Sequence, residues 1–443
     1  MSPPRFTEIK PKGAFSMIYF NNLVRNVKKE LSNYLLDNIC RDLPRNTTKF
    51  IYDMVWGILS SGSSKISNIG RRLFESNIRV TENRLALNLT ELNLSKVREN
   101  YFCYVFNNLL KLHPNIIIDE TDVIKPFGKA FEGLTIIHDA SKDGKPREKG
   151  YPVTGIISLT DDNYVVPLIT NIYSPLSVGY KSIGNETKKN LEQTIPYIKN
   201  GCNGIFSFDR GYDASFYAEY INDKGQFYVI RAKEKRIYIT NKGKMNINEI
   251  ASHYKGKYSF KYKGIDNIEK TAKASAIKVS HKNFKEPFYL VIETIHNEND
   301  IRVYLTNIDC SNKEGVRKAL KGYRLRWRIE EYFRFVKQEY EFEKFMIRSL
   351  DGINNLFVCI NIAVTFLTSI IQTNKKLWEQ IQEVYQPLTN KEKEEMLIKK
   401  YGYHGINLYR AKKGMQIILG HTKGRPAIPG RDRRKRTEQL TLF

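Results

Sequence analysis

Four residues between positions 323 and 337 have the types and spacing of a phosphate-processing site. Tyr323, Arg326, Glu330 and Lys337 stand at relative positions 0, 3, 7 and 14. On an α-helix of about 3.6 residues per turn, they fall within roughly 60° of one face. A carboxylate flanked by two cations and a phenol suits a group that holds a divalent metal while its neighbours hold phosphates.

The same segment has an apolar arc. Leu325, Ile329, Phe333 and Val336 lie away from the four polar residues, so the segment predicts one continuous helix with a buried face of its own. An ordinary amphipathic helix with a solvated charged side is the alternative interpretation.

Two aspartates occupy similar positions along the chain. Asp119 directly follows the apolar run 115–118, and Asp209 follows the run 204–208. Open α/β sheets place their sites at the carboxyl ends of strands. Together with Glu330 from a packed helix, these aspartates would form a trio of hard oxygen ligands of the kind Mg²⁺ prefers. Two such ions about 3.5–4 Å apart can activate a water and stabilise the leaving oxygen of an in-line displacement at phosphorus.

Other acids compete for these roles. Asp122 lies three residues past Asp119, and Asp139 follows a further predicted strand. Strand-end aspartates also commonly form turns and helix caps. Asp209 has additional support, because Gly211 permits a tight turn after it and Arg210 can face a phosphate.

Positive charge surrounds these acids and dominates the whole chain. Lys125 and Arg231 would add cations to the same cleft, with solvated loop charge as the alternative. Across 443 residues, 72 Lys and Arg stand against 47 Asp and Glu, a formal net charge of +25. Such an excess favours a polyanionic partner, because cationic side chains release counterions when they bind phosphates.

A membrane is the competing anionic partner, and the sequence argues against it. The first ten residues lack the apolar core of a signal peptide. The longest apolar run, 353–371, contains three asparagines and predicts a buried helix. Five scattered cysteines without a CxxC pair indicate a reducing compartment and no zinc site. We therefore expect a cytoplasmic protein.

Alternating strands and helices predict an α/β fold around a mixed central sheet. Its predicted strands are 115–118, 134–138, 153–159, 164–173, 204–208 and 227–231, and its predicted helices are 184–198 and 213–221. From 236 to 308 the hydrophobic period changes to two, which predicts an antiparallel β region before the helix that carries Glu330.

The two ends of the chain have sequence patterns that differ from the alternating strands and helices of the middle. Residues 15–110 show helical periodicity, with two short basic stretches at 61–73 and 81–89 that predict either a DNA-binding helix-turn-helix or a plain helical bundle. Thr81 is a candidate cap for the second stretch. The last residues, from Lys423 on, contain a basic run that predicts a tail touching nucleic acid non-specifically or a solvated disordered tail.

These motifs together resemble the DDE transposases, specifically the insertion-sequence-four family of bacterial cut-and-paste elements. The signature of that family, Tyr-x2-Arg-x3-Glu-x6-Lys, is similar to the series that begins at Tyr323 and ends at Lys337. Its second block resembles the run from Asp209 to Tyr212. Its first block resembles IIIDETDVIK, which contains Asp119 and Lys125.

The resemblance implies a fold, an activity and partners. The fold would be ribonuclease-H-like, interrupted by the antiparallel β insertion. Asp119, Asp209 and Glu330 would be the catalytic acids and would bind two Mg²⁺ or Mn²⁺ ions. The DNA-binding residues would be Tyr323, Arg326, Lys337, Arg210, Lys125 and Arg231. Relatives work as homodimers on double-stranded DNA with terminal inverted repeats and join it to target DNA in the bacterial cytoplasm, at the nucleoid.

The resemblance also implies a division of the chain. The predicted parts are 1–110, a helical DNA-binding region; 111–235, the first part of the catalytic core; 236–308, the β insertion; 309–375, the second part of the core; and 376–443, a helical region with a basic tail. Some relatives stack a flipped base on a tryptophan of the insertion. No tryptophan lies in 236–308 here, and Tyr258, Phe260 or Tyr262 could provide an aromatic face instead.

The predicted function is therefore metal-dependent cleavage at element ends followed by strand transfer. A DNA-binding protein of the same fold without catalysis is the first alternative. A plain metal-dependent nuclease is the second.

Overall fold

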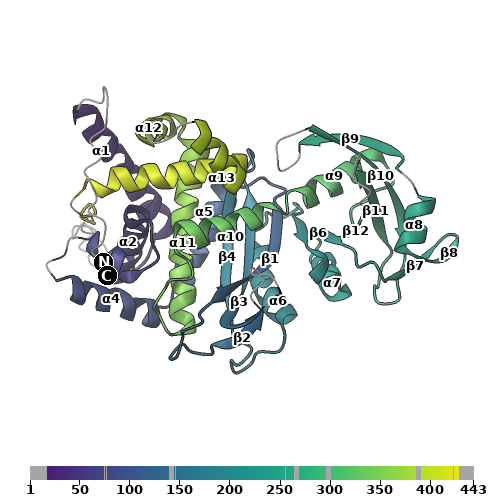
Figure 1. Cartoon of the computed structure of the whole chain (residues 1–443), viewed down its shortest axis with the longest axis horizontal. Helices are drawn as coiled ribbons and strands as arrows, with labels where there is room; N and C mark the ends of the chain where they lie inside the picture. The colour runs from purple at the N-terminus through teal and green to yellow at the C-terminus, as the bar shows by residue number, and fades with distance from the viewer. Residues whose placement is uncertain are drawn as a thin grey trace, which may run out of the picture.

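The computed structural model of the chain describes residues 17–73, 75, 77–138, 144, 146–254, 256–263, 269–295, 301–385, 391–422 and 424–428. Helices gather at one end of the molecule, and strands run through the middle to the other end (Figure 1). Asp139 and the basic run of the C-terminal tail lie outside the described residues, so the predictions made for them stay predictions.

The helices and strands follow one another along the chain in three groups. The first group is α1 (Met17–Asn33), the π-helix η1 (Tyr34–Ile39), α2 (Arg45–Ser61), α3 (Ile66–Arg71), α4 (Ile78–Glu91) and α5 (Ser95–Asn108). The second is β1 (Asn115–Ile124), β2 (Thr135–His138), β3 (Arg147–Leu159), β4 (Val165–Ile172), α6 (Ile183–Thr194), η2 (Ile195–Tyr197), β5 (Ile205–Phe208), η3 (Arg210–Tyr212), α7 (Ser215–Asp223) and β6 (Phe227–Arg231). The third is β7 (Ile237–Thr240), β8 (Gly243–Asn246), α8 (Ile247–His253), β9 (Tyr258–Lys263), β10 (Glu269–Val279), β11 (Phe288–Ile295), β12 (Ile301–Thr306), α9 (Lys313–Arg324), α10 (Arg328–Glu339), α11 (Leu350–Thr373), α12 (Lys375–Tyr385) and α13 (Lys391–Gly420).

The central sheet is mixed. β4, β3, β1, β5 and β6 lie side by side, with β1 antiparallel to β3 and parallel to β5, which is in turn parallel to β6. All four residues of β5 are buried, as expected for a parallel strand covered on both faces. The predicted α/β class with a mixed sheet is confirmed, and the ribonuclease-H-like description of it stays a prediction.

The antiparallel strands expected between 236 and 308 extend this sheet. β12 pairs with β6, and β11, β10 and β9 follow outward in that order, while β7 and β8 form a separate two-stranded sheet. The pairing of Tyr304 with Arg231 joins the two parts. Because one ladder of hydrogen bonds runs through the junction, the antiparallel strands have a fixed position relative to β1 and β5.

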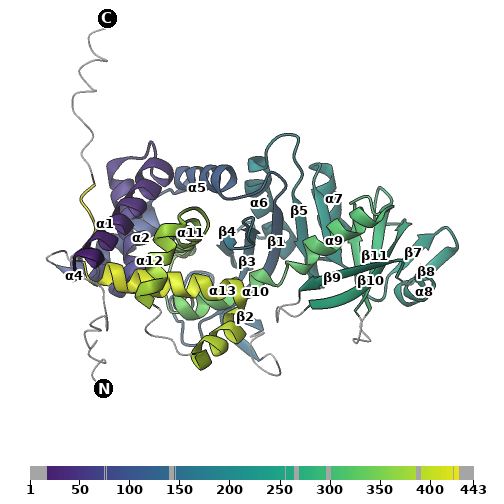
Figure 2. The same ribbon diagram turned by 90° about the horizontal axis from the view of Figure 1, so that it is seen from above.

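Helix α11 lies between the sheet and the N-terminal helices, and Figure 2 shows it end-on. It packs against β4, α2 and α4, and Thr368 donates a hydrogen bond to the main-chain oxygen of Val165. By length and composition it could cross a membrane, but 83% of its most apolar window is buried inside the protein. The predicted buried helix at 353–371 is confirmed.

The N-terminal helices contain one wrong prediction. Helix α4 begins at Ile78, and its cap is Asn77, whose side chain accepts a hydrogen bond from the main-chain nitrogen of Val80. Thr81 lies inside the helix and donates to Glu75 at 2.7 Å. The capping prediction for Thr81 failed because the helix extends by one turn toward a residue that caps equally well.

A clamp connects the turn before α3 to the end of α10. Glu341 has φ 53°; Ser63 donates to its carboxylate at 2.6 Å, Lys65 does so at 3.3 Å, and Ser64 donates to its main-chain oxygen at 3.0 Å. Burial alone would raise the pKa of Glu341, but hydrogen bonds from Ser63, Lys344 and Lys65 outweigh it and lower the pKa to about 2. The ionised carboxylate therefore stabilises this junction.

Candidate active site

The strand register places two of the predicted acids side by side. The parallel pairing of β1 with β5 ends at Ile118 and Phe208, so Asp119 and Asp209 are the next residue on each strand. Asp209 directly follows the last residue of β5, as predicted. The prediction that a strand ends before Asp119 is wrong, because β1 stays paired with β3 as far as Ile124 and Asp119 therefore lies inside the strand, at the point where its pairing with β5 stops. Side chains alternate along a strand, so Asp122 is on the face opposite to Asp119.

The third acid comes from a helix that is not continuous. The prediction of one helix over 323–337 is wrong, because α9 ends at Arg324 and α10 begins at Arg328. Between them, Arg326 and Arg328 each donate a main-chain hydrogen bond to the third residue before them. This tighter i to i+3 turn rotates Tyr323 relative to Glu330.

A glycine lets α10 approach the sheet closely. A Cβ added at Gly155 on β3 would lie 2.4 Å from Phe333 and 3.5 Å from Ile329. Gly155 is the cross-strand partner of Asp119. The absence of a side chain at this point thus brings the helix that carries Glu330 down onto the strand that carries Asp119.

All three acids meet at one guanidinium group. Arg326 lies 2.7 Å from Asp119, 2.5 Å from Glu330 and 3.9 Å from Asp209. Its side chain is 17% exposed, so the pairing takes place partly out of water. The sequence predicted that the acids converge and that Arg326 is nearby, but not that Arg326 lies among them.

The electrostatics follow from this crowding. Burial raises the pKa of Asp119 to about 6, although Arg326 opposes the rise, and the nearby carboxylates of Asp209 and Glu330 add to it. Burial alone would lower the pKa of Arg326, but Asp119, Tyr323 and the other two acids raise it above its ordinary value. The cluster is therefore an arrangement of negative charges that requires a cation.

Divalent metal is a chemically suitable cation for this cluster. Among the described residues, no group of three or more His, Cys, Asp or Glu side chains lies close enough to hold a metal ion, because the guanidinium group separates the carboxylates. The donor set nevertheless fits: three carboxylates from three elements point at one positive centre, and carboxylate oxygens are what Mg²⁺ and Mn²⁺ bind.

Tyr323 borders the acids on the side of the antiparallel strands. Its hydroxyl donates to Asp209 at 3.3 Å, and its ring packs 4.4 Å from that of Tyr304. Burial raises the pKa of Tyr323 to about 12, so its hydroxyl keeps its proton and remains a donor at neutral pH. Such a donor could bind a phosphate oxygen.

The two predicted lysines lie on the opposite side of the acids. Lys337 donates to the main-chain oxygen of Asp122 at 2.6 Å and pairs with Glu343 at 3.2 Å. Lys125 is 8% exposed and donates to the main-chain oxygens of Glu343 and Phe345. Its ammonium group faces these carbonyls, so this position does not support the predicted DNA contact of Lys125.

The two predicted arginines differ in their surroundings. Arg210 forms an exposed ion pair with Glu234 at 2.8 Å. Arg231 lines a groove that begins at the acid cluster and has a volume of about 790 Å³. The groove is bounded by residues from β9 to β12, from the α9–α10 turn, from α10 and from α13, among them Lys263, Lys270, Arg302, Arg334 and Lys399. These five cations were not among the predicted site residues, because they are far apart in the chain and no local sequence pattern connects them.

The aromatic residues proposed for base stacking are largely covered. Arg324 lies 3.6 Å from the ring centre of Tyr262 and forms a 2.5 Å ion pair with Glu293. Phe260 is 6% exposed, and Tyr258 is half-buried. None of the three presents a fully open ring face to the groove.

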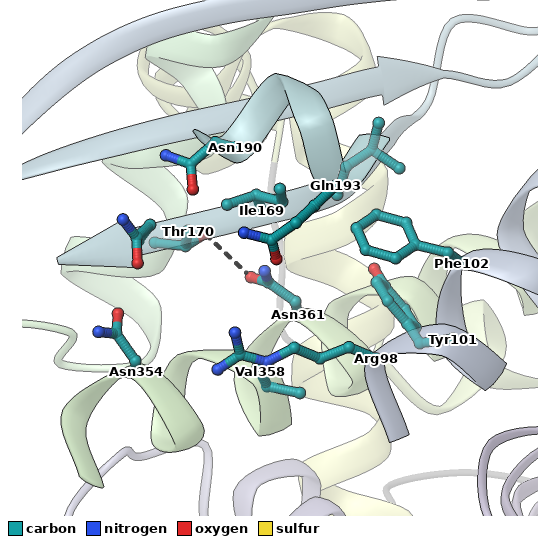
Figure 3. Close-up of a pocket in the computed structure, with 12 residues that line it drawn as sticks. Arg98, Tyr101, Phe102, Ile169, Thr170, Asn190, Gln193, Asn354, Val358 and Asn361 are labelled. Carbon is teal, nitrogen blue, oxygen red and sulfur yellow. Dashed lines mark hydrogen bonds between the residues drawn. The ribbon is translucent and has the colours of Figure 1, made fainter. Parts of the chain in front are cut away.

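A second cavity lies away from the acids, between α5, β4, α6 and α11 (Figure 3). Its volume is about 30 Å³, which is room for one or two waters. Polar side chains such as Arg98, Asn190 and Asn361 line it, and Thr170 donates to Asn361 at 3.1 Å. Its size suits ordered water in the core and not a substrate.

One protein family and one solved structure show similarity to the chain. A family model described as the transposase DDE domain matches residues 111–366. A solved structure, the cryo-EM structure of the piggyBac transposase synaptic complex with hairpin DNA, is similar at a TM-score of 0.38 and 11% sequence identity, over 96% of this chain and 87% of that chain. No curated protein matches.

Proposed function

The chain belongs to the transposase DDE domain family, and from this we propose that it cleaves DNA at the ends of a mobile element and joins the freed ends to target DNA. The finer assignment, to the insertion-sequence-four group of cut-and-paste enzymes, rests on the spacing of Tyr323, Arg326, Glu330 and Lys337. The strand order β4-β3-β1-β5-β6 supports a ribonuclease-H-like core.

One observation carries the proposal. Asp119, Asp209 and Glu330 come from two strands and a helix, more than 200 residues apart at the extremes, and all three pair with Arg326. Three carboxylates gathered around one positive centre favour catalysis over DNA binding alone, because unneutralised acids repel phosphate.

We infer that these three acids hold two Mg²⁺ or Mn²⁺ ions in the working enzyme. Bound there, the ions would supply an activated water or 3′-hydroxyl and neutralise charge on the leaving oxygen. Arg326 would then turn its guanidinium group from the carboxylates to a phosphate, which it can bind in a bidentate manner. Tyr323 would donate a hydrogen bond to the same phosphate group, and Lys337 would add positive charge beside it.

The proposed partners follow from the same chemistry. The net charge of +25 favours double-stranded DNA with terminal inverted repeats, and a second DNA as the target. We propose that two copies of the chain act together, one on each end. The protein would work in the bacterial cytoplasm, at the nucleoid.

The test is incubation of the purified protein with end-bearing DNA and Mg²⁺. Cleavage followed by joining supports the proposal, cleavage alone would indicate a nuclease, and binding without cleavage would indicate a catalytically silent DNA-binding protein.

Asp119→Asn, Asp209→Asn and Glu330→Gln should each lower cleavage by roughly 10²–10³-fold or more while DNA binding stays largely intact. Asp122→Asn is the control. If it abolishes cleavage and Asp119→Asn does not, the first acid is misassigned.

A further inference from the structure

The groove beside the acids has a wall that lies outside the segment matched by the family model. Residues of the N-terminal half of α13, namely Glu395, Ile398 and Lys399, line this groove together with residues of β9 and β10. The family model ends at residue 366, whereas α13 begins at Lys391. This part of the groove therefore belongs to the C-terminal region of the chain.

This wall is fastened to the helix that carries Glu330. Arg334 on α10 donates to the main-chain oxygen of Lys400 at 2.6 Å, and Tyr401 donates to Glu339 at 2.5 Å. At Gly402, with φ 76° and ψ 169°, α13 breaks and turns. Because both contacts are made to α10, the wall keeps a fixed position relative to the acids.

The groove is positively charged even though four acids line it. Glu293 pairs with Arg324, Glu330 with Arg326, and Glu331 with Arg328 at 2.9 Å. The fourth acid, Glu395, is outside these three pairs, and the exposed cations Lys263, Arg334 and Lys399 outnumber it. A polyanion is the ligand that such a lining attracts.

We propose that the N-terminal half of α13 is a DNA-binding wall that holds the unpaired strand leading away from the cleaved phosphodiester, with Lys399 contacting its backbone. This inference rests on the proposed function. The groove volume of about 790 Å³ is in the range of clefts that enclose a single drug-sized molecule. A few nucleotides of one strand match that size, whereas a double helix does not.

Two neighbouring lysines provide a matched comparison. Lys399 lines the groove, whereas the ammonium group of the adjacent Lys400 lies 4.8 Å from the ring centre of Tyr401. Both side chains are exposed and carry the same charge. If only the total positive charge matters, substituting either lysine weakens DNA binding equally. If a contact in the groove matters, only substitution of Lys399 weakens it.

The experiment measures binding of the full chain to an element-end DNA carrying a short unpaired flank, by fluorescence anisotropy across a KCl series in EDTA. Lys399→Gln should weaken binding several-fold and reduce the salt slope by about 0.7, the value for one phosphate contact on a single strand. Lys400→Gln should change neither quantity. Glu395→Gln should strengthen binding, because it removes a negative charge from the groove.

Several outcomes would overturn the inference. The first is that Lys399→Gln and Lys400→Gln weaken DNA binding equally, and the second is that Lys399→Gln does not weaken it at all. The third is that Lys399→Gln weakens binding of the flanked DNA and of a fully paired, blunt DNA to the same extent. A thermal melt equal to that of the wild type excludes misfolding as the cause of lost binding. Cleavage by Asp119→Asn separates the two proposals: if it persists, the proposed function fails while the binding comparison remains valid.

Discussion

At the residue scale, the site is built around Arg326. Three carboxylates in a partly buried cluster repel one another, and the rise in the pKa of Asp119 to about 6 reflects burial and that repulsion. The guanidinium group offsets the repulsion in the absence of metal. Arg326 and the proposed metal ions therefore compete for the same oxygens.

This competition gives a prediction for Arg326→Gln. Without the guanidinium group, the metal-free protein should lose about 1–3 kcal/mol of unfolding free energy, less than for a fully buried pair because Glu330 is half exposed. Added Mg²⁺ should then raise the melting temperature of the variant more than that of the wild type, because no bound cation has to be displaced. Thermal melts in EDTA and in Mg²⁺ measure both effects. An equal Mg²⁺ shift in the two proteins would contradict the competition.

At the element scale, local sequence patterns predicted most strands and helices but not their junctions. The strand predicted at 227–231 is β6 without change, because its apolar run reports its own burial. The helix over 323–337 was wrong because Arg324 pairs with Glu293 in β11 and Arg326 pairs with Asp119 in β1. These partners are distant in the chain, so the periodicity of the local sequence cannot predict the ion pairs or the break in the helix.

The close approach of α10 to the sheet yields a second prediction. Gly155→Ala would place a methyl group 2.4 Å from the ring of Phe333. Overpacking of this kind costs about 1–3 kcal/mol, and displacement of α10 should move Glu330 and lower cleavage. The double variant Gly155→Ala with Phe333→Leu should recover part of both losses, since the shorter side chain makes room. Urea unfolding and cleavage rates measure the two effects. The absence of any recovery would mean that Gly155 acts in another way.

The clamp at Glu341 gives a pH-dependent prediction. Its pKa falls from the ordinary value to about 2 in the folded protein, so its stabilising contribution is fully present above the unfolded pKa and disappears as pH falls from about 4.5 to about 2. Glu341→Gln should cost roughly 2–3 kcal/mol at pH 7 and progressively less below pH 4.5. Urea unfolding at several pH values tests this. The exposed pair of Glu314 with Arg317 is the control, and Glu314→Gln should change stability little. A loss at Glu341 that is constant down to pH 2 would refute the ionic origin of the clamp.

At the scale of the whole molecule, the site draws on parts of the chain that the sequence treated separately. The antiparallel strands between 236 and 308 were predicted as an insertion, but β12 pairs directly with β6 and places Arg302 and Tyr304 in the lining of the groove that Glu330 also lines. Helix α13 was predicted only as part of a helical C-terminal region. No sequence pattern predicts that the first half of α13 borders the same groove, because the position of that half depends on a single break at Gly402.

Gly402 thus lies where the C-terminal region meets α10, the helix that carries Glu330, and its substitution tests that connection. A Cβ at this position would lie 1.7 Å from the carboxylate of Glu331 and 3.4 Å from the ring of Trp327. The backbone also adopts φ 76° and ψ 169°, a region essentially confined to glycine that costs an L side chain about 1–3 kcal/mol. Gly402→Ala should therefore destabilise the protein and shift the first half of α13 away from α10.

Amide hydrogen exchange measures the shift directly. In Gly402→Ala, the amides of residues 393–401 should exchange faster than in the wild type, and binding of DNA with an unpaired flank should weaken as it does in Lys399→Gln. The control is Gly420→Ala near the end of the same helix, where the nearest atom to an added Cβ is Arg72 Nη1 at 3.7 Å and both readouts should stay unchanged. If exchange rises at Gly402→Ala while DNA binding does not change, the first half of α13 packs against α10 but makes no contact with the DNA, because its displacement would otherwise weaken binding.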